Sequence, residues 1–491
     1  MSSKRAHLTR FAPLLLAPAL VSCVWILDFD SLQTEEGKGG STSTGGSTGG
    51  GDDGGAGTGG TGACPSSCYD DDPCTVDGCT SDGECTRELL TGLVLDGVDE
   101  TIPADVHYRT TMAAASDAFF LSSYSITGGS SEVTFYRLDA NAPSDALSTI
   151  ARLGELDLGD AVPRSAAGLA VDTALGRIHA FIGMENPNLG ARLWHVVLDM
   201  NYSVVSRTAV LTGYGDPSPY NHPIAANIGG EIASAWINAN GTASLWTGKL
   251  AGPAELAVGQ TPMALALLAT PDGEPLVLYG VNGGGVFVEG NGVPASAIQE
   301  CQTRAGNYLS ASATSVGVPG FWLAYWTKYG AETATEPGFL TTDGRGLACS
   351  ALGCAAPIEG DCQSALSNAV RNVAVAIASR PGDPTGLVHA VQATPVVGPT
   401  EDGQGIYAGI ILGATRIDFG PVFFETEAVT TKLGEDIVLS AMPTALPNLT
   451  GPDYPAVSYV PPDRFAVSWT QPSTTAGSEL RIQRYRLCAA E

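Results

Sequence analysis

The sequence predicts an all-β protein, and three observations support that prediction. Within residues 100–491, the chain consists of short stretches in which hydrophobic and polar residues alternate, as is typical of half-buried strands. Gly, Pro, Asn and Asp separate these stretches, and these are residues that favour turns. Hydrophobic residues make up 44% of the 491 residues and charged residues only 15%, which is enough for a large core under a surface poor in charge.

Residues 1–22 have the composition of a signal peptide. Lys4, Arg5 and Arg10 form a positive N-terminal region, and an apolar run follows from Phe11 to Val21. A run of this length is too short to cross a bilayer of ~30 Å as a helix. The sequence therefore predicts export.

The apolar run ends in Leu20-Val21-Ser22-Cys23. This motif resembles the lipobox of bacterial lipoproteins, which implies cleavage after Ser22 and a lipidated Cys23 at the new N-terminus. The resemblance implies a membrane as partner, held through acyl chains such as palmitate, with each buried CH₂ contributing ~0.8 kcal/mol. Val24 stands where Asp marks inner-membrane lipoproteins, so the resemblance favours the cell outer membrane or cell surface. The alternative is an ordinary secretory signal in which Cys23 is incidental.

Two segments separate the signal peptide from the folded part. Residues 23–36 would form a lipid-anchored N-terminal segment. Residues 37–63 consist almost wholly of Gly, Ser and Thr, without an aromatic residue or an aliphatic one larger than Ala. Such a segment buries nothing and predicts a disordered linker with a reach of roughly 30 Å.

The cysteines predict disulfide bonds. Without Cys23, the 11 cysteines become an even number, as expected of a protein oxidised outside the cytoplasm. They form two groups of five: Cys64, Cys68, Cys74, Cys79 and Cys85, and then Cys301, Cys349, Cys354, Cys362 and Cys488. Because each group is odd, complete pairing requires at least one bridge between a small module at 64–88 and the large domain. The alternative is one free thiol in each group.

The small module resembles the cysteine-rich CTDC repeat first known from slime moulds. The matching residues are Cys68, Asp70, Asp71, Cys74, Thr75, Asp77, Cys79 and Cys85. Asp72 and Thr80 depart from the repeat, which usually has Gly and Asp at these positions. The resemblance covers this short segment alone and implies an extracellular module without a catalytic role, in which each disulfide contributes ~2–4 kcal/mol.

The acidic residues of this module invite a test for metal binding. Asp70, Asp72 and Asp77 could offer oxygen ligands to Ca²⁺, but their spacing is not that of an EF-hand loop. Zinc requires thiolates, whereas cysteines in an exported protein are oxidised. A solvated acidic surface is the preferred interpretation, and no metal and no cofactor are predicted.

A three-strand unit recurs seven times in residues 100–491. Its first strand carries Ala or Ser at alternate positions, at 111–115, 168–172, 223–227, 263–267, 309–313, 373–377 and 455–459. Its second strand ends in an aromatic residue in six units and in Val in the other: Tyr124, Phe181, Trp236, Tyr279, Trp326, Val391 and Trp469. Its third strand mixes bulky and charged residues, at 132–138, 192–198, 243–250, 285–290, 338–342, 405–411 and 479–487.

Seven such units predict a seven-bladed β-propeller. Small residues suit the crowded inner strands, aromatic residues pack between blades, and the charged third strand would be the outer one facing solvent. Closure into a ring removes exposed sheet edges. A bridge from Cys488, close to the C-terminus, would hold the last blade. Tandem β-sandwiches are the alternative architecture.

Charge and motifs exclude several functions. With 24 Lys and Arg against 51 Asp and Glu, the net charge is −27, so the chain lacks the basic surface that nucleic acids require. It contains no H-E-x-x-H zinc motif, no G-x-S-x-G elbow, no P-loop and no Rossmann fingerprint. Histidines at 179, 195 and 389 fall inside predicted strands, which favours packed side chains, and His222 falls on a loop.

The sequence therefore favours an exported, lipid-anchored cell-surface protein that is a non-catalytic binding or scaffold module for protein or glycan. One alternative is a secreted glycan-active hydrolase or lyase on a propeller, which would place two acids and a His or Tyr at the axis. Another is a structural envelope or matrix component. A binding module would instead have an axis lined by Ala and Ser, with exposed aromatic residues on one loop face.

Overall fold

The structure is a computed structural model that divides into two compact units, Met1–Thr61 and Gly62–Glu491. It describes residues 66–488 except 71, 143–146, 153–155, 157, 159–161, 187–189, 213–221, 239, 258–259, 271, 282–284, 300–305, 318–321, 331–337, 341–347, 351–352, 356–369, 383, 396–406, 419–428, 444–452 and 474–476. All described residues belong to the second unit. Among them, no helix is long and apolar enough to cross a membrane. The predicted signal peptide, anchor and linker lie outside the described residues.

The described part begins with a small hairpin module. A single 3-10 turn, η1 (Ser66–Cys68), precedes strands β1 (Thr75–Cys79) and β2 (Cys85–Leu89). The two strands pair antiparallel and form a sheet of their own. So small a sheet has almost no core, and it depends on covalent and ionic links to the rest of the chain.

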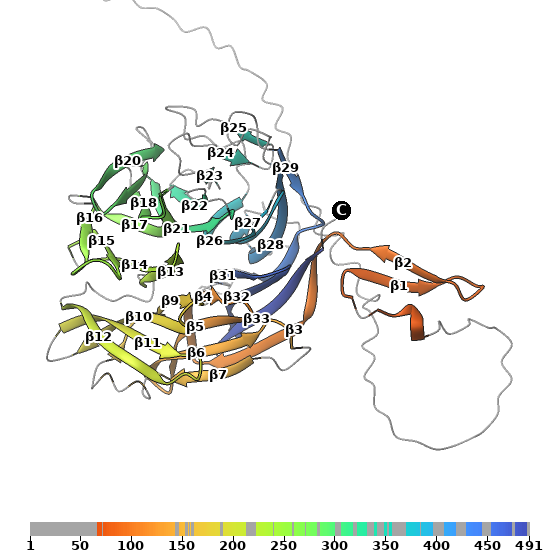
Figure 1. Cartoon of the computed structure of the whole chain (residues 1–491), viewed down its shortest axis with the longest axis horizontal. Helices are drawn as coiled ribbons and strands as arrows, with labels where there is room; N and C mark the ends of the chain where they lie inside the picture. Colours follow the sequence, from red (N-terminus) through yellow and green to blue (C-terminus); the bar gives the residue numbers. More distant parts are fainter. Residues whose placement is uncertain are drawn as a thin grey trace, which may run out of the picture. The chain divides into compact units, whose positions relative to one another are not determined.

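The remaining strands form a propeller-like ring of antiparallel sheets, which Figure 1 shows in chain order. The sheets of the first half are β4 (Val106–Ala114), β5 (Ala118–Thr127), β6 (Ser130–Asp139) and β7 (Leu147–Arg152); β8 (Val162–Pro163), β9 (Gly168–Asp172), β10 (Arg177–Asn186), β11 (Gly190–Asp199) and β12 (Val204–Thr212); and β13 (Ile224–Ile228), β14 (Glu231–Ile237), β15 (Ala243–Thr247) and β16 (Ala254–Leu256).

The sheets of the second half follow the same order. They are β17 (Pro262–Ala269), β18 (Pro275–Val281), β19 (Gly285–Gly290) and β20 (Val293–Gln299); β21 (Gly306–Ser315), β22 (Trp322–Gly330), β23 (Gly338–Leu340), β24 (Ala348–Ser350) and β25 (Gly353–Ala355); β26 (Val370–Arg380), β27 (Thr385–Pro395), β28 (Tyr407–Asp418), β29 (Val429–Lys432) and β30 (Ile437–Pro443); and β31 (Asp453–Val460), β32 (Arg464–Ser473), β33 (Gly477–Cys488) and β3 (Gly92–Ala104).

The innermost strands of these sheets close a circle. β4 adjoins β9, which adjoins β13, and the series continues through β17, β21, β26 and β31 back to β4. The ring replaces the alternative of tandem β-sandwiches. Each small-residue segment predicted from the sequence falls within one of these strands or overlaps it by all but one residue, because only small side chains fit where strands converge on an axis.

The last sheet is completed by a strand from the other end of the chain. β3 pairs with β33 from Gly92 opposite Cys488 to Ala104 opposite Ser478, with an irregularity between Leu95 and Asp99. β3 thus begins upstream of residue 100, where the sequence places the start of the large domain. This pairing joins both ends of the ring, so that the first and last sheets cannot separate without breaking a long ladder.

The third strand of each predicted unit is not the outermost, which corrects the sequence interpretation. β7, β12, β16 and β20 pair with the outer edges of β6, β11, β15 and β19. Covered in this way, β6 buries Val133 and Phe135. Short outer strands with weak alternation are difficult to recognise in a sequence, and this is why they were missed.

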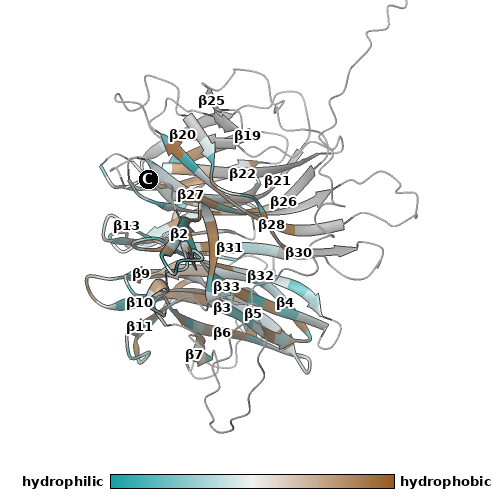
Figure 2. Cartoon of the chain, turned by 90° about the vertical axis from the view of Figure 1, so that its right-hand side faces the viewer, coloured by the Kyte–Doolittle hydropathy of each residue, from teal (hydrophilic) through white to brown (hydrophobic). Residues whose placement is uncertain are grey.

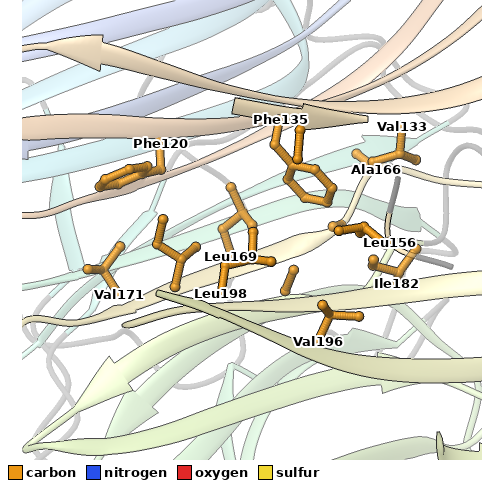
Figure 3. Packing of buried hydrophobic residues seen from close by; sticks show 14 of the residues in the cluster. Phe120, Val133, Phe135, Leu156, Ala166, Leu169, Val171, Ile182, Val196 and Leu198 are labelled. Carbon is orange, nitrogen blue, oxygen red and sulfur yellow. The ribbon is translucent and has the colours of Figure 1, made fainter. Parts of the chain in front are cut away.

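Hydrophobic packing between neighbouring sheets forms the core. Phe120 and Phe135 from one sheet lie against Leu169 and Leu198 from the next (Figure 3). The hydrophobic colour in Figure 2 lies mainly along the strands. Burial of each large side chain contributes ~1.5–3 kcal/mol, so the interfaces between sheets stabilise the ring.

The aromatic position predicted for the second strands lies in these interfaces. Tyr124, Phe181, Trp236, Tyr279 and Trp469 are all 2% exposed or less. The side chains of Trp326 and Val391 lie outside the described part. The polar atoms of the buried aromatic residues find partners nearby: Trp236 Nε1 donates to Asn238 Oδ1 at 2.9 Å, and Trp469 Nε1 donates to Gln471 Oε1 at 3.1 Å. The prediction that these residues pack between blades is confirmed for the five.

A buried arginine holds the junction between the last and first sheets. Arg484 is 2% exposed and donates to the carbonyl oxygens of Asp96, Asp139 and Ala142 at 2.7–3.1 Å. Its Nε also lies 3.1 Å from the Asp96 carboxylate, which Arg464 contacts at 3.1 Å as well. Because all three guanidinium nitrogens donate hydrogen bonds, the burial of this charge is tolerated, and Arg484 fixes β33 against β3 and β6.

Candidate functional site

A cavity of about 250 Å³ lies on the axis of the ring, between the innermost strands. Its lining consists mainly of Ala, Leu, Ile, Val, Ser and Thr from β4, β9, β13, β17, β21, β26 and β31. The space exists because these strands converge but carry short side chains. The cavity lining therefore includes the Ala and Ser side chains that we expect along the axis of a binding module.

Hydroxyl groups along the axis bind the backbone of the neighbouring strand. Three side chains of β21 accept hydrogen bonds from backbone N–H groups of β26 at 3.1–3.3 Å: Ser310 from Val375, Ser312 from Ile377 and Thr314 from Ser379. These bonds fasten two inner strands that lack direct ladder pairing. The hydroxyls serve as structural links, which explains why Ser and Thr recur in the inner strands.

The described lining residues include no Asp and no Glu. Glycoside hydrolysis at the axis would need a pair of carboxylates there. Such a pair is not present among the residues that the structure describes around the cavity. The chemistry that this lining offers is apolar contact along the axis and polar contact at one end.

The polar end is a cluster of Arg109, His222 and Tyr454, which all line the cavity. Nη1 of Arg109 lies 3.2 Å from Nδ1 of His222, and its guanidinium carbon lies 3.9 Å from the centre of the Tyr454 ring. Each residue belongs to the beginning of an inner strand: β4, the segment leading into β13, and β31. We call these three residues the mouth cluster.

The chemistry of arginine defines the protonation of His222. A guanidinium only donates hydrogen bonds, so Nδ1 of His222 must accept, and a neutral ring then carries its proton on Nε2. Burial, and then the positive charge of Arg109, hold the pKa of His222 well below its usual value. At neutral pH, Arg109 is therefore the charged member of the cluster, and all three side chains can donate hydrogen bonds.

The backbone is irregular at the mouth cluster. Tyr454 has a positive φ of 39°, which L-residues other than Gly, Asn and Asp rarely adopt. The register of β31 shifts between Asp453 and Ala456, and that of β4 shifts between His107 and Thr110. Such conformations cost ~1–3 kcal/mol and cluster at functional sites. In the sequence, the one signal of this site is a charged residue, Arg109, two residues ahead of the small-residue segment 111–115.

The histidines that the sequence places inside strands, at 179, 195 and 389, are packed in the sheets, and burial lowers the pKa of His389 on β27. His179 on β10 and His195 on β11 lie 2.9 Å apart between Nδ1 and Nε2, and His195 stacks on Phe181 at 4.5 Å. Burial lowers the pKa of His195 to about 4, with a smaller contribution from His179. His107 is 7% exposed, and its burial likewise lowers its pKa to about 4. None of these four histidines lines the axial cavity.

The aspartates that could offer oxygen ligands to Ca²⁺ have hydrogen-bond partners within the module. Asp70 Oδ1 accepts from the Asp72 backbone N–H and the Thr75 hydroxyl at 3.0 Å, and Asp77 Oδ2 accepts from the Asp70 N–H at 2.9 Å. The hydrogen bond from the Asp72 N–H is the main cause that lowers the pKa of the Asp70 carboxyl. No group of three or more metal-ligating side chains occurs in the described part of the chain. These aspartates cap turns.

The disulfides link the hairpin module to itself and to the ring. Cys68 pairs with Cys85, and Cys74 pairs with Cys488, at the end of the last strand. Cys79 is also disulfide-bonded. Arg486 Nη1 adds an ionic contact at 2.9 Å to Asp72. The second bridge is of the kind required by the odd cysteine count of each group.

The structure describes less of the remaining cysteines. Cys349 and Cys354 are opposite each other in the pairing of β24 and β25, and nothing is described of their side chains. Cys23, Cys64, Cys301 and Cys362 lie outside the described residues. Their predicted lipidation and pairing therefore stay predictions.

Comparisons with known proteins identify no family. No protein-family model matches the chain, and no curated protein sequence is similar to it. Among solved structures it is similar to AofleA from Arthrobotrys oligospora, with 12% identity, a TM-score of 0.37, and coverage of 70% of this chain and 91% of that chain. It is also similar to a protein of unknown function from Dyadobacter fermentans, with 11% identity, a TM-score of 0.38, and coverage of 81% and 99%.

The WD40 domain of SCAP from fission yeast is a third similar structure. It has 9% identity and a TM-score of 0.32, with coverage of 78% of this chain and 98% of that domain. At these identities and TM-scores, the resemblances assign no function to this chain.

Proposed function

We propose that this chain is an exported, lipid-anchored cell-surface protein whose ring is a non-catalytic binding or scaffold module. One observation carries the proposal: the axial cavity is lined by small apolar and hydroxyl residues, and its described lining contains no carboxylate. The hydroxyls of β21 already bind the neighbouring backbone, so they are unsuited to nucleophilic attack. The ring therefore offers a shaped surface rather than acid–base chemistry.

We propose a ring of seven blades. The cyclic series of inner strands from β4 to β31 supports this number, since each of them leads one sheet. Closure by β3 and β33, with the Cys74–Cys488 bridge beside it, supports a rigid module. Rigidity is useful to a binding surface because little ordering is needed when a partner binds.

Protein and glycan remain the proposed partners for the loop faces. The large hydrophobic side chains exposed on the described part of the ring are aliphatic, such as Leu175 and Val205. The exposed aromatic residues expected on one loop face of a binding module are therefore absent from the described part of the ring. A glycan array probed with the purified full-length protein tests for binding, and release of reducing ends from any bound glycan would contradict a non-catalytic role.

The membrane anchor rests on the lipobox resemblance. Metabolic labelling with an alkyne analogue of palmitate should label the wild-type protein and leave the Cys23→Ser variant unlabelled. Fractionation should then find the wild type in membranes and the variant in the soluble fraction. Equal labelling of both proteins would refute lipidation at Cys23.

A further inference from the structure

The mouth cluster gives the axial cavity a polarity that the strands around it lack. Arg109 is the one side chain charged at neutral pH among the described residues that line the cavity. Around the rest of the cavity, Ala264, Leu265 and Ile377 are typical of the lining. A charged group at one end and apolar walls elsewhere suit an amphipathic ligand.

The size of the cavity limits that ligand. A volume of about 250 Å³ exceeds that of an apolar protein cavity of about 150 Å³ that is known to hold benzene. This space admits a small organic molecule, and an oligosaccharide or a peptide would extend beyond it. A sugar would in addition need polar partners along its whole length, and the described polar side chains concentrate at the mouth or bind the backbone.

The electrostatics of the mouth cluster favour an anionic group. Arg109, Tyr454 and the neutral His222 ring all donate hydrogen bonds, and the face of Tyr454 holds the guanidinium at 3.9 Å. The net charge of −27 repels anions at long range, but salt screens this field within about 10 Å. At contact distance, the guanidinium and its neighbours therefore dominate.

The strained backbone lies at the mouth cluster as well. Tyr454 retains its positive φ where the registers of β4 and β31 are both irregular. Regular pairing would lie at lower energy, so its loss beside a cavity indicates that the position of these side chains matters. The strain lies at the cavity mouth, next to the charge.

We propose that the axial cavity binds a small organic acid, with its carboxylate at the mouth cluster and its aliphatic or aromatic body between the inner strands. This proposal rests on the proposed role of the ring as a binding module and names the class of one ligand. Arg109 recognises the carboxylate, and Tyr454 orients Arg109. The apolar lining discriminates against small polar anions such as acetate or phosphate.

Ligand-observed ¹⁹F NMR of the full-length protein tests the proposal. The probes are 4-fluorobenzoate and 4-fluorobenzamide, which share size and apolar body and differ in charge. We expect the benzoate to bind at least tenfold more tightly than the benzamide. Arg109→Gln should weaken benzoate binding roughly ten- to hundredfold, since a hydrogen-bonded charge is lost, and should remove the preference between the probes.

Matched variants separate recognition from folding. Arg152→Gln makes the same change of charge at a residue that is not part of the cavity lining, and it should bind the benzoate as the wild type does. Arg109→Lys keeps the charge and should retain most of the affinity. Met263→Glu adds a negative charge at a half-exposed lining residue and should weaken the benzoate without affecting the benzamide.

Three results would overturn the proposal. These are equal affinity of the wild type for both probes, unchanged benzoate binding by folded Arg109→Gln, and unchanged benzoate binding by Met263→Glu if the Arg109 variant does not fold. Each of them leaves the membrane anchor and the glycan array as independent tests of the proposed function. Conversely, if the wild-type protein were not labelled by the palmitate analogue, the measured affinities for the two fluorinated probes would still stand.

Discussion

The Cys74–Cys488 disulfide should contribute more to the stability of the ring than any other bridge that the structure describes. It joins residues separated by 414 positions. The chain-entropy relation for a loop of this length gives about 6 kcal/mol at 25 °C, and measured losses on removal of native disulfides are usually 2–5 kcal/mol. We therefore expect the variant Cys74→Ser/Cys488→Ser, the long-loop variant, to lose about 4 kcal/mol in free energy of unfolding.

The Cys68–Cys85 bridge provides a matched control. Its sequence separation is 17, and both cysteines belong to the hairpin module, outside the sheets of the ring. The variant Cys68→Ser/Cys85→Ser should therefore leave unfolding of the ring almost unchanged. Equilibrium urea unfolding, followed by tryptophan fluorescence, reports on the ring, because six of the seven tryptophans belong to it, among them the buried Trp236 and Trp469. An unchanged midpoint for the long-loop variant, or equal shifts for both variants, would refute the reasoning.

Three further predictions concern buried polar groups. Burial lowers the pKa of His107 and His195 to about 4, so their contribution to stability is complete above pH 6.5. As the pH falls from 6.5 toward 4, this contribution is lost, and each histidine should lower the free energy of unfolding by up to about 3 kcal/mol. Measurement of Tm against pH should show this loss as a falling Tm. Asp96→Ala should lower the free energy of unfolding in urea by ~3 kcal/mol, because it leaves the buried guanidinium of Arg484 without its ion pair. The control Asp117→Ala, at a side chain that is 57% exposed, should change this free energy by almost nothing. Trp236→Phe should cost ~1–3 kcal/mol, and a smaller loss would mean that the indole hydrogen bond contributes little.

Much of the ring was predictable because its strands repeat a local pattern. Alternation of Ala and Ser placed the inner strands, and an aromatic residue at the end of the second strand placed residues such as Trp236 and Tyr279, both 0% exposed. These patterns arise from crowding at the axis and packing between sheets, which act in the same way in each unit. The outer strands escaped prediction because they are short and partly solvated, so their composition carries little periodicity.

The candidate site was less predictable than the fold. An axis of small residues followed from the inner strands, but nothing in the local sequence connects Arg109 with Tyr454. Their segments, HYRTT and DYPAV, read as ordinary strand beginnings. The two residues meet because β4 and β31 become neighbours only when the ring closes.

The cysteines show the same division. Their odd number in each group already required a bridge between the module and the ring if all were paired, because parity depends on composition alone. Only the folded chain selects Cys74 and Cys488 as that bridge, since β3 brings the module beside the end of β33. Periodicity and counting report what each segment buries, whereas pairing between distant segments depends on how the whole ring closes.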